Sequence, residues 1–77
     1  MTRTNMDRAQ EGLALCAKIQ ELTGTDELRD QVSDILCQLM HTCRLVPDED
    51  GDPIDFDDAL ATARINFEAE TTEDPDN

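Results

Sequence analysis

Hydrophobic positions recur every three to four residues in the first part of the chain, at Ala9, Leu13, Cys16 and Ile19. This spacing is typical of one face of an amphipathic α-helix, and it predicts a helix over residues 5–22. Thr4 or Asn5 can cap its start by accepting hydrogen bonds from the first backbone amides. Gly12 interrupts the apolar stripe at a cost of about 1 kcal/mol relative to alanine. We therefore expect another helix to pass close to Gly12.

The segment TGTDE carries the signals that end this helix and begin the next. Gly24 is a typical C-terminal stop, and Thr25 is expected to cap the following helix. That helix is predicted over residues 26–45, and Pro47 prevents its continuation. It has the cleanest apolar periodicity in the chain, at Leu28, Val32, Ile35, Leu36, Leu39, Met40 and Cys43.

The stretch PDEDGDPIDFDD, residues 47–58, packs seven carboxylates into twelve positions and has two parts. PDEDGDP has the composition of a turn, whereas IDFDD opens a third helix with Asp55 as its cap and further acids in its first turn. That helix is predicted over residues 56–70, with an apolar face made by Phe56, Ala59, Leu60, Ala63 and Phe67. Residues 71–77 are acidic and without aromatic side chains, so we expect a disordered tail.

Three short amphipathic helices predict an all-α fold, a small three-helix bundle in one domain over residues 1–70. We expect the first two helices to form an antiparallel hairpin that the third covers. A chain of 77 residues buries little surface, so a metal, a disulfide or a second copy is expected to add stability. Three cysteines without paired spacing and no signal segment indicate reduced thiols and a cytoplasmic location.

The net charge of −13 lies almost wholly in the second part of the chain. Residues 1–46 carry seven acids against five bases, whereas residues 47–77 carry twelve acids against Arg64 alone. Such a field repels phosphates and attracts basic surfaces over about 8 to 10 Å at ordinary salt. The charge therefore argues against direct nucleic-acid binding, and the short apolar runs argue against membrane insertion.

Asp48, Asp50 and Asp52 alternate as the ligands of a calcium loop do. Such a loop requires glycine at its sixth position and glutamate at its twelfth, where this chain has Pro53 and Ala59. A solvated acidic turn is therefore the leading interpretation, and a weak divalent-ion site is the alternative.

Cys37 and His41 lie one helical turn apart and can be drawn, with Cys16 and Cys43, as a zinc site. The same pair can be drawn as a nucleophile and its base, but no third group orients them. Cys16 and Cys43 fall in the apolar stripes, where a thiol acts as a small hydrophobic group. We expect no metal, no cofactor and no catalytic residue.

DELRDQVSDILCQL followed by IDFDDALATAR resembles the all-α nucleoside triphosphate pyrophosphohydrolases of the MazG type. The resemblance implies magnesium held by paired acids on facing helices. Here Glu27, Asp30 and Asp34 lie roughly opposite the apolar stripe of their helix, which departs from that arrangement. A degenerate nucleotide hydrolase is therefore kept as the second alternative.

DILCQLMHTC and IDFDDALATARINFEAE, with the acidic connection between them, are similar to a group of small acidic proteins encoded by phages, plasmids and integrative conjugative elements. The similarity covers about residues 33–70. Asn66 and Phe67 stand where histidine and tyrosine are common in that group. No activity is assigned to the group, so the resemblance implies an origin in a mobile genetic element and no catalytic residues.

The leading functional expectation is a non-catalytic acidic protein that docks on a basic surface of a host protein, one that handles nucleic acid. Its carboxylates would substitute for phosphates and inhibit host defence, as an anti-CRISPR protein does, or other nucleic-acid machinery. The expected contacts are Asp48, Glu49, Asp50, Asp52, Asp55, Asp57, Asp58, Glu68 and Glu70.

The first alternative is a homodimeric structural or regulatory module. Cys37 and Ile65 fall outside the main apolar faces of their helices, which favours a second buried surface. Its contact strip would lie on the second helix, at Glu27, Asp30, Asp34, Cys37 and His41. In that case the acidity of the chain gives only solubility.

Overall fold

The computed structural model describes residues 3–73, which form three α-helices and no strand. The helices are α1 (Asn5–Thr23), α2 (Leu28–Leu45) and α3 (Phe56–Glu73). The predicted all-α fold is confirmed, with helix boundaries close to those expected. α3 runs three residues past its predicted end, so the beginning of the expected disordered tail is helical. The rest of that tail, residues 74–77, lies outside the described residues.

Local side-chain chemistry fixes both ends of α1. The Thr4 hydroxyl oxygen accepts the Asp7 backbone N–H at 3.1 Å, and an Asp7 carboxylate oxygen accepts the Thr4 backbone N–H at 3.0 Å. This reciprocal pair is a capping box, which satisfies two amides that the helix itself leaves open. Gly24 ends the helix in the left-handed conformation, with φ of 77°, as predicted.

The start of α2 differs from expectation because Thr25 does not cap it. Glu27 occupies the capping position without a side-chain hydrogen bond. The Thr25 hydroxyl instead donates to a carboxylate oxygen of Asp34 at 2.6 Å. Gln31 reaches back from α2 and donates its side-chain amide to the carbonyl of Thr25 at 2.9 Å and to that of the following residue at 3.1 Å. Side chains from within α2 thus hold the loop that precedes it.

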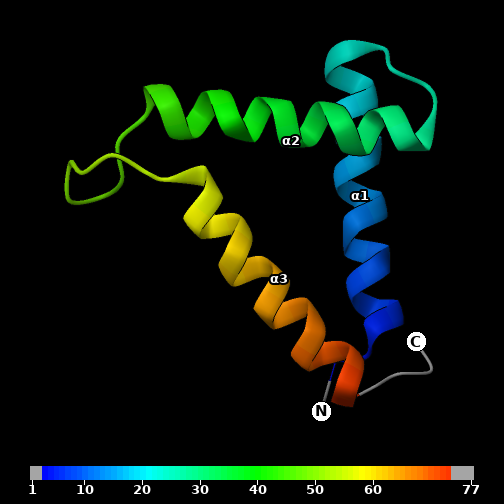
Figure 1. Ribbon diagram of the computed structural model, residues 1–77. Helices are drawn as coiled ribbons and strands as arrows, with labels where there is room; N and C mark the ends of the chain where they lie inside the picture. Colours follow the sequence, from blue (N-terminus) through cyan, green and yellow to red (C-terminus); the bar gives the residue numbers. More distant parts are fainter. Residues whose placement is uncertain (1–2, 74–77) are drawn as a thin grey trace.

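α1 and α2 cross one another, and α3 runs from the far end of α2 back toward the beginning of α1 (Figure 1). The three helices therefore outline an open triangle, and the predicted antiparallel hairpin of the first two is wrong. The triangle closes where α3 meets α1. There the Arg8 guanidinium lies 3.5 Å from the Glu70 carboxylate, and the Asn5 amide donates to the Glu70 carbonyl at 3.2 Å.

Little of the apolar surface of the helices is buried. Within residues 3–73 the buried side chains are Cys16 and Ile19 of α1 and Gln31 of α2. Large apolar residues on all three helices are 40% or more exposed, including Leu13, Val32, Leu36, Leu39, Leu60 and Phe67. Hydrophobic stabilisation is proportional to the apolar area removed from water. A single chain in this arrangement therefore realises only part of the stabilisation that its three apolar faces offer.

Replacing Gln31 with methionine, which keeps its length, should destabilise the protein by about 1 to 2 kcal/mol, because two hydrogen bonds to loop carbonyls are lost. The free energy of unfolding in urea measures this change. Gln38→Met, at an exposed position of the same helix, is the matched control and should change stability by less than about 0.5 kcal/mol. Equal effects of the two substitutions would contradict the role of Gln31 in holding the loop.

The capping box makes part of the stability depend on pH. The hydrogen bond from the Thr4 backbone N–H, followed by that from the Thr4 hydroxyl, lowers the pKa of Asp7 below its ordinary value of 3.8. A lowered folded-state pKa stabilises the helix above the unfolded pKa, and this contribution is lost as the pH falls through the folded value. NMR titration of the Asp7 carboxyl should give a midpoint below 3.8. Asp7→Asn should lower the melting temperature at neutral pH but not at pH values below that midpoint.

Candidate functional site

The acidic turn that joins α2 to α3 is built around Asp48. One oxygen of its carboxylate accepts the backbone N–H groups of Asp50 and Asp52, each at 2.9 Å. Its backbone N–H donates to the Asp52 carbonyl at 2.9 Å, and its carbonyl accepts the Gly51 N–H at 3.0 Å. Gly51 has φ of 83°, a conformation that glycine adopts without strain. Asp48 thus orders the turn, and its side chain is half-buried.

The other carboxylates of the turn point to solvent. Glu49, Asp50 and Asp52 are exposed, and their carboxylates make no hydrogen bond or ion pair within residues 3–73. The backbone that carries them is held at four places by Asp48. The turn therefore presents three unpaired negative charges on an ordered loop.

The acids at the start of α3 extend this surface. An Asp55 carboxylate oxygen accepts the backbone N–H groups of Asp57 at 2.9 Å and Asp58 at 3.2 Å, so Asp55 caps α3 as predicted. Asp57 and Asp58 are exposed in the first turn, where the helix dipole favours negative charge. We name this surface the acidic edge, and it consists of Asp48, Glu49, Asp50, Asp52, Asp55, Asp57 and Asp58.

The two remaining predicted contacts do not belong to the acidic edge. Glu68 lies ten residues beyond Asp58 on α3, a distance of about 15 Å along the helix, which is longer than the Debye length at ordinary salt. Glu70 is half-buried and ion-paired with Arg8 of α1, so it closes the triangle of helices. Sequence spacing gives no sign of this pairing because α1 and α3 are far apart in the chain.

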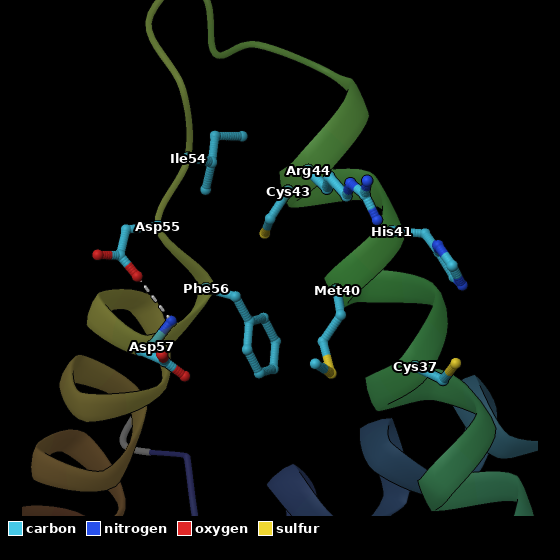
Figure 2. A pocket seen from close by; sticks show the side chains of 9 residues that line it. All are labelled: Cys37, Met40, His41, Cys43, Arg44, Ile54, Asp55, Phe56 and Asp57. Carbon is cyan, nitrogen blue, oxygen red and sulfur yellow. Dashed lines mark hydrogen bonds between the residues drawn. The ribbon is translucent and has the colours of Figure 1, made fainter.

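A pocket of about 450 Å³ lies between the end of α2 and the start of α3 (Figure 2). Met40 and Phe56 face each other across it, and Cys43 points toward it. Cys37, His41 and Arg44 of α2 also line the pocket, opposite Asp55 and Asp57 at the start of α3. Basic and acidic side chains therefore line the same pocket.

The structure does not assemble the proposed zinc set. Cys16 is buried in α1, whereas Cys37 is exposed on α2 and lines the pocket between α2 and α3. Within the part of the chain that the structure describes, no group of three or more histidine, cysteine, aspartate or glutamate side chains is placed to hold a metal ion. In the acidic turn, one Asp48 oxygen is already engaged by two backbone amides.

Two of the three acids that carry the resemblance to the pyrophosphohydrolases, Asp30 and Asp34, have partners nearby. Asp34 accepts the Thr25 hydroxyl at 2.6 Å, and Asp30 lies 3.4 Å from the guanidinium of its neighbour Arg29. Glu27 occupies the capping position of α2. Across residues 3–73 these side chains meet no second acidic pair with which they could hold magnesium.

The structure also shows a surface that the sequence pattern did not indicate as a site. A groove of about 460 Å³ lies between α1 and the first half of α2. Its lining is apolar and includes no charged side chain: Ala9, Gly12, Leu13, Leu15, Cys16, Leu28, Val32, Ile35 and Leu36. We name it the apolar groove. The sequence signal for it was Gly12 within the apolar stripe of α1.

Scans against protein-family models, curated proteins and solved structures give no match to this chain. The similarity to proteins of mobile elements therefore stays a prediction. No helix within residues 3–73 has both the length and the apolar character needed to cross a membrane. The acidic edge and the apolar groove are thus the two surfaces from which a function can be inferred.

The order of the acidic turn should depend on one side-chain oxygen. Asp48→Ala removes the acceptor of two backbone amides, so the Asp50 and Asp52 amides should lose protection from hydrogen exchange. Asp48→Asn keeps an acceptor oxygen while removing the charge, and it should keep their protection. Amide exchange followed by NMR measures both. Equal protection in the two variants would contradict the role of Asp48.

Proposed function

We propose that this protein is a non-catalytic binding protein whose acidic edge docks on a basic surface of a partner protein, one that normally binds nucleic acid. The observation that carries the proposal is the ordered turn, in which Asp48 fixes the backbone while Glu49, Asp50 and Asp52 stay exposed and unpaired. Net charge of either sign favours solubility, but solubility does not require that the charges be held in a fixed arrangement.

The ordered turn favours binding for two physical reasons. Its loop is already folded, so association with a partner orders little further backbone. Its charges directly precede the acids of the α3 start in the chain, so turn and helix start form one continuous acidic segment. A row of fixed carboxylates can replace the phosphates that a nucleic-acid-binding surface normally meets. The acidic edge therefore suits a partner rich in arginine and lysine.

The kind of partner follows from the resemblance to proteins of phages, plasmids and conjugative elements together with the charge. A mobile element gains from blocking proteins of its host that bind nucleic acid. We therefore propose that the acidic edge inhibits a host-defence system, such as a CRISPR effector, or other nucleic-acid machinery. The absence of a metal cluster within the described residues gives no support to the alternative of nucleotide hydrolysis.

The proposal can be tested by neutralising the exposed turn carboxylates together, as Glu49→Gln, Asp50→Asn and Asp52→Asn. The wild-type protein, immobilised and incubated with bacterial lysate, should capture a nucleic-acid-binding protein that is released as salt rises. Added double-stranded DNA should compete with this capture. Loss of three interfacial charges should weaken the measured affinity for the recovered partner by about tenfold or more at low salt.

A control with the same change in charge is Glu21→Gln, Asp26→Asn and Asp30→Asn. These residues lie near the beginning of α2, at the opposite end of that helix from the acidic edge (Figure 1). α2 is about 27 Å long, so the two sets are well separated. The control should keep the affinity of the wild type. Equal weakening in both variants would show that only the total charge matters, and it would contradict docking through the acidic edge.

A further inference from the structure

The chain exposes more surface than a compact protein of its size. Its accessible surface is 6350 Å², whereas a compact monomer of 8.6 kDa exposes about 4,700 Å². Its radius of gyration is 14.4 Å, against about 11.5 Å for a compact domain of 77 residues. The excess surface is on the order of 1,000 Å² or more.

That excess is of the size that a stable dimer buries. Obligate homodimers bury about 2,000 Å² or more in total, or about 1,000 Å² on each partner, and their interfaces are rich in apolar side chains. Exposed apolar side chains lie on all three helices. At the apolar groove, Leu13, Val32 and Leu36 are each 42% to 46% exposed. A single chain therefore leaves exposed an apolar surface about as large as the one that each partner of a stable homodimer buries.

Gly12 gives a second, independent observation at the same place. No other part of residues 3–73 packs against it, because a Cβ atom built at Gly12 would have no heavy atom within 4 Å beyond the backbone of its own helix. The expected close approach of another helix within the chain is therefore wrong. Gly12 still lowers the stability of α1 by about 1 kcal/mol relative to alanine. A glycine between Ala9 and Leu13 on an uncovered apolar face leaves room for a helix of another molecule to approach closely.

We propose that the apolar groove is the interface of a homodimer, in which the groove of each copy is covered by apolar helical surface of the other. The chain itself carries exposed apolar helical surface, since Leu60 and Phe67 lie on the same apolar face of α3 and are 40% and 64% exposed. The contact strip expected from sequence on α2 does not line the apolar groove: Glu27, Asp30, Asp34, Cys37 and His41.

The distribution of charge is compatible with this dimer and predicts how salt changes its stability. No charged side chain lines the apolar groove, so its burial leaves no ion without a partner. Each copy nevertheless carries a net charge of −13, so two copies repel one another at long range. Salt screens this repulsion. Added salt should therefore strengthen the dimer or leave it unchanged, whereas it should weaken docking of the acidic edge on a basic partner.

Sedimentation equilibrium of the full chain across micromolar concentrations tests the proposal. The expected mass is that of two copies of the 8.6 kDa chain, at low and at moderate salt alike. A monomer at all concentrations and at both salt concentrations would overturn the proposal. The proposal would also be wrong if the groove of this monomer bound a different protein or peptide.

Val32→Glu places a charge inside the groove and should raise the dissociation constant of the dimer at least tenfold. The monomer should tolerate it, because Val32 is 46% exposed. Ser33→Glu is the matched control: it adds the same charge at the next residue of α2, which is exposed and does not line the groove, and it should stay dimeric. If Val32→Glu loses its helical circular dichroism, Gly12→Glu replaces it, because among residues 3–73, the backbone of its own helix aside, no heavy atom lies within 4 Å of a Cβ atom at that site.

A dimer that persists in both groove variants would use another surface, and that result would overturn the proposal. The proposal does not depend on the function of the acidic edge. The variant Glu49→Gln, Asp50→Asn and Asp52→Asn should keep the mass of a dimer even where it loses a basic partner. Conversely, a groove variant that is monomeric and still binds the basic partner would show that binding through the acidic edge does not require the dimer.

Discussion

The rest of this structure depends on one constraint: the crossing of α1 and α2 buries few side chains. Cys16, Ile19 and Gln31 are the buried side chains of the described residues, and one of the three is an amide. The hydrogen bonds of the Gln31 amide to two carbonyls of the loop between α1 and α2 hold the start of α2 against that loop. In other small domains a larger apolar core sets the direction of one helix relative to the next. Because the crossing touches only part of each helix, long apolar faces stay open to water, and α3 closes the triangle through Glu70.

The helices and their ends could be read from the sequence because short-range interactions determine them. Thr4 and Asp55 cap amides two or three residues away, and Gly24 ends α1 through its own backbone freedom. The crossing could not be read, since it depends on Gln31 and Asp34 turning back to a loop that the spacing pattern assigned to a Thr25 cap. Periodicity shows which face of a helix is apolar but not what covers that face.

The same distinction explains which parts of the candidate site were predictable. The acidic turn and its continuation into α3 are adjacent along the chain, so the sequence alone is enough to place them close together. The division of work within the turn, in which Asp48 orders the loop and its neighbours face solvent, depends on hydrogen-bond geometry. Glu70 was assigned to the same surface because it is acidic, yet Arg8, from the other end of the chain, pairs with it. Long-range pairing of this kind leaves no pattern in a single sequence.

The contact between α1 and α3 also brings two distant parts of the polypeptide together. Asn5 and Glu70 are joined by a hydrogen bond of 3.2 Å across 65 positions of sequence. Because the start of α1 meets the last turns of α3, a short linker could join these two helices while new ends are opened in a surface loop. Opening the acidic turn between Asp50 and Gly51 would leave all three helices continuous. The order of the turn could then be removed without changing a single side chain.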